Sequence, residues 1–189
     1  SHGYILRNKV QSFIDIYDNM SKNIEIDKKA LVLYSTMTGR TKKIATIINE
    51  EFEKQNIHSE IMDVNKIPKE EVMKAINDAD VVFFGSSTKY ADIIGNMEDI
   101  LKSLSNLNLE KKIGAAFGSY GWSGEAIEVV QDYLKRTNIK VLSTSDVIKS
   151  TGMIDIEFPI RIKFSPSINN VKGIESAVIY TADLLLSTI

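Results

Sequence analysis

The stretch Phe117-Gly118-Ser119-Tyr120-Gly121-Trp122-Ser123-Gly124-Glu125-Ala126 follows an apolar run and leads into a helical pattern. A strand that ends in a glycine-rich turn and then enters a helix presents backbone N–H groups and the positive end of a helix dipole at the edge of a sheet. Open α/β sheets bind anionic or planar ligands at such edges. The stretch therefore predicts an α/β fold with a ligand-binding cradle at the end of one strand.

Short apolar runs alternate with amphipathic segments along the chain from residue 30 onward. The run Val81-Val82-Phe83-Phe84 is apolar at consecutive positions, which is typical of a parallel sheet covered on both faces. The alternation predicts a doubly wound, five-stranded parallel sheet. We expect strands over 30–34, 57–64, 80–85, 112–118 and 140–147, helices over 41–55, 68–79, 93–106 and 124–137, a further strand-like piece over 156–164, a last helix over 168–187 and a lead-in helix over 8–20.

Composition restricts the classes of function. With 189 residues, 43% of them hydrophobic, the chain can bury one core, but it is short for two ordinary domains. The 23 basic and 25 acidic residues give a net charge of -2, which provides no field to gather nucleic acid or an anionic membrane. The sequence has no cysteine, so thiolate metal sites and cysteine nucleophiles are excluded. Because no apolar run approaches the roughly 20 residues of a membrane span, we expect a cytoplasmic protein.

The loop after the first predicted strand is rich in hydroxyl groups. A phosphate monoester needs many short hydrogen bonds, and the N–H groups at a helix N-terminus supply them without a lysine. The absence of a Gly-Lys-Ser/Thr motif argues against a nucleoside triphosphate. The alternative is an ordinary turn in which a hydroxyl side chain caps the helix. The candidate phosphate-binding residues are Ser35, Thr36, Met37, Thr38, Gly39, Arg40 and Thr41.

Two further loops are expected at the same edge, because the carboxyl ends of parallel strands meet there. They carry small residues and aromatic side chains suited to a flat ring, so the three loops together predict flavin mononucleotide (FMN). Each aromatic side chain could instead serve ordinary packing or simply be exposed at the surface, and Lys89 could stabilise an anionic reduced flavin or simply be solvated. The candidate residues are Ser86, Ser87, Thr88, Lys89 and Tyr90 in the second loop, and Gly118, Ser119, Tyr120, Gly121 and Trp122 in the third.

These motifs resemble the flavodoxin family. Its first-loop pattern of aromatic, any residue, Ser/Thr, two residues, Gly, any residue, Thr is met by Tyr34, Thr36, Gly39 and Thr41. The segment 117–126 is similar to the third flavin loop of the flavodoxin domain in flavodiiron proteins, also called A-type flavoproteins. The sequence departs from that family at Ser87, where proline is usual, at Tyr90 and Ala91, where asparagines are usual, and at Thr38 and Arg40, where an aromatic residue and a serine are frequent.

The resemblance also extends to the beginning of the chain. Ser1-His2-Gly3 resembles the junction at which the family's metallo-β-lactamase-like domain ends, and there the histidine is a ligand of the diiron centre. We therefore expect residues 1–28 to be a junction segment with the lead-in helix, residues 29–189 to be the FMN-binding domain, and His2 to be a metal ligand. The other interpretation is that Ser1 and His2 are the remnant of a tag.

The resemblance implies an electron-transfer role. In the family, FMN takes electrons from a rubredoxin-type donor and passes them to a diiron site that reduces dioxygen or nitric oxide, and full-length chains form head-to-tail homodimers. One terminal histidine does not make a diiron site, so we expect this chain to carry the flavin half of an oxidoreductase and no catalytic residues. Two alternatives stay open: a flavodoxin-like interaction module without flavin, and a free-standing flavodoxin-like carrier or quinone reductase.

Overall fold

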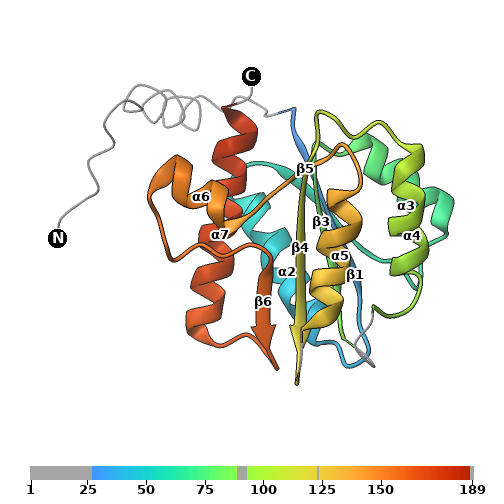
Figure 1. The fold of residues 1–189 in the computed structure, drawn as a ribbon, viewed down its shortest axis with the longest axis horizontal. Coiled ribbons are helices and arrows are strands. Elements are labelled where there is room, and N and C mark those ends of the chain that lie inside the picture. Colours follow the sequence, from blue (N-terminus) through green and yellow to red (C-terminus); the bar gives the residue numbers. More distant parts are fainter. Residues whose placement is uncertain (1–26, 89–92, 123, 188–189) are drawn as a thin grey trace.

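The computed structural model of the chain describes residues 27–88, 93–122 and 124–187, so the predicted lead-in helix lies outside the described residues. Strands and helices alternate through most of this part of the chain (Figure 1). The strands are β1 (Lys29–Ser35), β2 (His58–Asp63), β3 (Val81–Ser86), β4 (Ile113–Tyr120), β5 (Lys140–Val141) and β6 (Ile160–Lys163). The helices are α2 (Arg40–Lys54), α3 (Lys69–Asp78), α4 (Met97–Ser103), α5 (Glu125–Lys135), α6 (Thr144–Thr151) and α7 (Ile168–Leu186).

The strands form one parallel sheet in the order β2-β1-β3-β4-β5, which confirms the predicted doubly wound, five-stranded sheet. The fifth position is filled by two short strands. β5 pairs with β4 at Ile113 and Gly114, and β6 pairs with the same strand from Phe117 to Tyr120. The segment 142–159, which contains α6, therefore interrupts the outer strand and returns to the sheet near its carboxyl edge.

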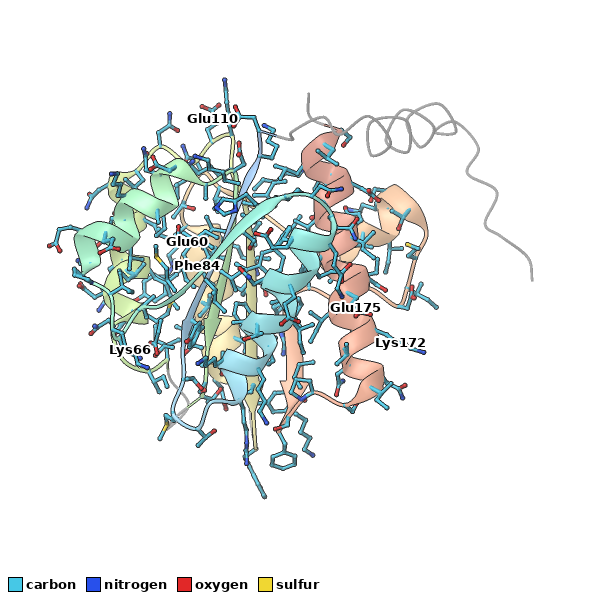
Figure 2. All side chains as sticks on the ribbon, turned by 180° about the vertical axis from the view of Figure 1, so that it is seen from behind. Glu60, Lys66, Phe84, Glu110, Lys172 and Glu175 are labelled. Carbon is cyan, nitrogen blue, oxygen red and sulfur yellow. The ribbon has the colours of Figure 1, made fainter. Side chains whose placement is uncertain are left out.

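Alternate side chains of each strand enter two separate cores, one on each face of the sheet. Phe83 packs with residues of α2, α6 and α7, whereas Phe84 packs with residues of α3, α4 and α5. Both rings are fully buried, and Figure 2 shows Phe84 in the interior of the molecule. Burial on both faces explains why the strands are apolar at consecutive positions.

Three predicted elements were wrong in part. The strand expected over 140–147 ends at Val141, and the chain turns into α6. The cause is a local helix start: the Ser143 hydroxyl accepts a hydrogen bond from the Asp146 N–H at 3.3 Å and caps the helix. The strand expected over 156–164 is limited to β6, and the helix expected over 93–106 consists of α4 followed by a 3-10 turn, Leu104–Asn106.

The carboxyl edge of the sheet is the lower edge in Figure 1, where the arrowheads of β4 and β6 lie. Figure 2 has Lys66, which follows β2, toward this edge and Glu110, which precedes β4, at the opposite edge. The loops that follow β1, β3 and β4 therefore begin at one edge, as predicted. No helix in the described part of the chain is long and apolar enough to cross a membrane.

Candidate functional site

A chain of three buried hydroxyl groups joins the three loops. Thr41 Oγ1, at the start of α2, lies 2.7 Å from Ser87 Oγ in the loop after β3 and 2.9 Å from Ser119 Oγ near the end of β4. Three hydroxyls carry three protons, and the two hydrogen bonds between them use two. One proton stays available for an acceptor outside the chain of hydroxyls. The predicted convergence of the loops is thus a direct contact of their side chains.

The first loop leaves the N-terminus of α2 without a side-chain cap. Its N-cap residue is Gly39, in the left-handed conformation with φ 77°, and no side chain accepts a hydrogen bond from the first turn. The Thr36 hydroxyl accepts instead from the Gly39 N–H at 3.1 Å, which leaves the Thr36 proton free to be donated elsewhere. The N–H groups of the first helical turn have no carbonyl partners within a helix. An ordinary turn capped by a hydroxyl side chain is therefore not what the structure contains.

The predicted residues of the first loop separate into two groups. Ser35 and Thr41 are fully buried, and Ser35 Oγ accepts a hydrogen bond from Asn65 Nδ2 at 2.8 Å. Met37, Thr38 and Arg40 are exposed, and Thr36 is partly exposed. Ser35 is thus a supporting residue, and the surface of the loop is formed by the residues that follow it.

The second loop begins with a buried serine pair. Ser86 Oγ donates to the Ser87 carbonyl at 3.0 Å and accepts from the Ile94 N–H at 3.3 Å, which ties the two ends of the loop together. Thr88 Oγ1 is buried and has no hydrogen-bond partner among the residues that the structure describes. Because buried polar atoms are nearly always paired, this hydroxyl is a candidate contact for a ligand. Lys89 and Tyr90 lie outside the described residues, so their predicted roles stay predictions.

The third loop combines a close backbone approach with an exposed aromatic ring. A Cβ atom at Gly118 would overlap the Ser86 carbonyl oxygen and contact Ile127 Cγ1 at 2.7 Å, so only glycine fits between β3 and α5. Tyr120 is partly buried and packs against the core that contains Phe84. The Trp122 side chain is 98% exposed at the same edge as the chain of hydroxyls. Indole rings bury large areas where they bind, so this one is available to a planar ligand or a partner.

Asn65, which the sequence reading missed, connects three elements at this edge. Besides donating to Ser35, its side-chain oxygen accepts the Asn96 N–H at 2.9 Å, and Asn96 Nδ2 donates to the Val64 carbonyl at 3.1 Å. The far end of the second loop is therefore fixed to the ends of β1 and β2. The sequence gives little sign of this role of Asn65, because asparagine after a strand is also common in ordinary turns.

Two cations and a tyrosine with a raised pKa lie among the ionisable groups at this edge. Arg40 and Lys163 both lie over the ring of Phe164, with no carboxylate partner among the described residues. Burial, and secondarily the charge of Asp63, raises the pKa of the Tyr34 phenol above its ordinary value. The phenol of the first-loop motif is therefore harder to ionise than a free tyrosine.

Metal ligands were predicted only at His2, which lies outside the described residues, so that assignment stays a prediction. Within residues 27–88, 93–122 and 124–187, no group of three or more His, Asp or Glu side chains is arranged to hold a metal ion.

An open parallel sheet with polar, glycine-containing loops gathered at its carboxyl edge defines the class of doubly wound, ligand-binding α/β proteins. Residues 32–166 match the family model of flavodoxin. The chain belongs to the flavodoxin family. The archaeal flavodoxin of known structure superposes with a TM-score of 0.68 at 28% identity, over 84% of this chain and 99% of that chain.

Longer proteins also match. The chain is 28% identical over 155 residues to rubredoxin-oxygen oxidoreductase of Megalodesulfovibrio gigas, covering 79% of this chain and 37% of the relative. It is 29% identical over 143 residues to nitric oxide reductase of Moorella thermoacetica, covering 76% and 36%. The flavodiiron core of Synechocystis has the same fold, with a TM-score of 0.74 at 20% identity, over 97% of this chain and 42% of that chain. The chain thus spans little more than a third of these relatives and is a flavodoxin-like domain related to flavodiiron proteins.

Proposed function

We propose that this chain binds FMN at the carboxyl edge of its sheet and acts as the electron-transfer domain of a flavodiiron oxygen or nitric oxide reductase. The observation that carries the proposal is the chain of hydroxyls from Ser87 through Thr41 to Ser119. It brings the loop suited to a phosphate and the two loops suited to a ring into direct contact.

The phosphate of FMN fits the first loop. The uncapped N-terminus of α2 offers N–H donors and a favourable dipole, and Gly39 has no side chain to obstruct a ligand. Thr36 and Thr38 add hydroxyl donors at the surface of the loop. The unused proton of the chain of hydroxyls adds one further donor from the buried side. The loop therefore supplies the several short hydrogen bonds that a dianion requires.

The isoalloxazine ring fits the other two loops. Thr88 Oγ1 is a buried group without a partner in the described part of the chain, and a polar atom of the ring edge would satisfy it. Trp122 is exposed where a flat ring could cover it. Gly118 admits the close backbone packing on which these two loops depend. The site would fix the position and the environment of the ring, and the bound flavin would supply one- and two-electron chemistry.

The larger assembly is part of the same proposal. Two relatives are named rubredoxin-oxygen oxidoreductase and nitric oxide reductase. By analogy, electrons would arrive from a rubredoxin-type donor and leave for a diiron site on a metallo-β-lactamase-like domain, within a homodimer. His2 would then belong to that metal site, and residues 1–28 would form the junction between the domains. The cytoplasmic location stays a prediction from composition.

Two other functions each have one observation in their favour. The hydroxyls of Thr41, Ser87 and Ser119 bond to one another within the protein, as they could in an interaction module without flavin. The chain covers almost all of an archaeal flavodoxin, as a free-standing carrier would. The buried Thr88 hydroxyl without a partner among the described residues and the uncapped helix favour a flavin site over the flavin-free module. The similarity to longer flavodiiron relatives is why we favour a domain of a larger enzyme over the free-standing carrier.

The test is reconstitution of the purified chain with FMN. Titration with FMN, followed by quenching of flavin fluorescence, should give one site per chain, and flavin should remain bound after desalting. Thr36→Ala should weaken the binding, whereas Ser105→Ala, which removes a hydroxyl bonded to Lys102 on a distant helix, should not. A chain that takes up no FMN would be the flavin-free module. The reading frame upstream of Ser1 separates the domain of a larger enzyme from the free-standing carrier.

A further inference from the structure

Phe164 has an unusual conformation at the carboxyl edge. It directly follows β6, its φ is 62°, and its side chain is 51% exposed. Left-handed backbone is uncommon for an aromatic residue, and it persists where the surroundings determine it. Here the Phe164 N–H donates to the Tyr120 carbonyl at 2.7 Å, which extends the pairing with β4 by one residue. The ring is thereby held outside the core, close to the third loop.

Two cations gather on this ring. The Arg40 guanidinium lies 5.8 Å from the ring centroid, and Lys163 Nζ lies 5.7 Å from the same centroid. Neither forms an ion pair with any described residue, whereas Arg161 in the same strand pairs with Glu128. Cation–π attraction holds each charge, but the two charges repel one another. A pair of cations brought together without a carboxylate is suited to an anion from outside the chain.

We propose that Phe164 is a positioning residue that holds Arg40 and Lys163 as the counter-charge of the FMN phosphate and so makes the site select FMN over riboflavin. The inference rests on the proposed FMN function and deepens it. Arg40 is the first residue of α2, so its backbone lies at the uncapped N-terminus where a phosphate would bind, and its guanidinium lies over the ring of Phe164. Phe164 directly follows β6, so its contact with Arg40 joins the start of α2 to the end of β6.

The chemistry accounts for the selectivity. A phosphate monoester carries close to two negative charges at neutral pH, and a guanidinium binds such a group through charge-assisted hydrogen bonds. Riboflavin has the same ring and no phosphate, so the cations contribute nothing to its binding. Losing one of the charges should therefore reduce the affinity for FMN and leave the affinity for riboflavin unchanged.

The experiment compares the dissociation constants of FMN and riboflavin for the full chain and for variants. Arg40→Gln should lower the preference for FMN about tenfold, the effect of one charge-assisted hydrogen bond. Phe164→Leu should lower the preference in the same direction, and Phe164→Tyr, which keeps a ring, should restore it. The matched control is Arg136→Gln: this guanidinium also lies over an aromatic ring, 5.4 Å from that of Tyr133, but it follows α5, at the opposite edge. Its removal makes the same charge change and should leave the preference unaltered.

The dependence of FMN affinity on salt concentration is a second measurement, and it would not change if Arg40 had a purely structural role. Wild-type binding of FMN should weaken with ionic strength more steeply than binding of riboflavin, and Arg40→Gln should reduce that difference. If Arg40→Gln and Lys163→Gln prefer FMN over riboflavin as strongly as Arg136→Gln does, the inference is overturned and the FMN site stands. If the wild-type chain binds neither flavin, the proposed function itself fails. Arg40 and Lys163 are exposed, so their variants keep the test valid even if Phe164→Leu does not fold.

Discussion

Thr41→Val is the substitution that examines the chain of hydroxyls most closely. Valine keeps the shape and the β-branch of threonine, so the helix start is little changed. The buried hydroxyl and its hydrogen bonds of 2.7 Å to Ser87 and 2.9 Å to Ser119 are lost. At about 1 kcal/mol for each hydrogen bond, the free energy of unfolding should fall by about 2 kcal/mol. Affinity for FMN should fall about tenfold, because the Ser87 and Ser119 hydroxyls lose the shared partner that holds the three loops together.

Urea denaturation gives the stability and flavin fluorescence gives the affinity, measured on the same preparation. Thr46→Val is the matched control. It makes the same change in the same helix, where the Thr46 hydroxyl donates only to the Lys42 carbonyl at 3.0 Å on the exposed face. Both quantities should then stay close to wild type. If Thr41→Val unfolds at the wild-type urea concentration and binds FMN normally, the hydroxyls do not join the loops in the way described above.

Two further substitutions address the supporting framework of the site. Gly118→Ala inserts a methyl group against the Ser86 carbonyl and Ile127, so it should lower the free energy of unfolding by roughly 1–3 kcal/mol and weaken FMN binding. The control is Gly173→Ala in α7, where the added Cβ meets nothing within 4 Å. It should raise the free energy of unfolding by roughly 0.5–1 kcal/mol in the same urea titration. Asn65→Ala removes the side chain that fixes the second loop, so it should lower the free energy of unfolding by about 2 kcal/mol. It should also speed amide hydrogen exchange in that loop. Exchange rates at the Ile94 and Asn96 amides that match wild type would count against this role.

The doubly wound parallel sheet was predictable from the sequence, whereas the order of its strands was not predicted. Consecutive apolar residues such as Phe83 and Phe84 are compatible with a strand buried on both faces, and that local pattern is sufficient to predict a doubly wound sheet. Helix α6 was not predicted, because Val141 and Val147 were assigned to one strand across the polar residues 143–146. The signal that could have identified it is Ser143 followed by Asp146, a helix start that competes with the strand.

The site was predictable at the level of loops and not of individual atoms. Parallel strands bring their carboxyl ends to one edge, so the convergence of the three loops followed from the fold class alone. The division between the buried hydroxyls of Ser35 and Thr41 and the exposed Thr38 depends on packing. The contacts of Asn65 with Asn96 and of Phe164 with Arg40 join residues far apart in the chain, and no local pattern contains them.

The direct test of the central claim is the amount of flavin that the purified chain retains. The chain, saturated with FMN and then desalted, should show the flavin absorption bands with one FMN per chain, and Thr41→Val treated in the same way should retain less. A wild-type chain that emerges colourless after saturation would contradict the assignment of the carboxyl edge as an FMN site.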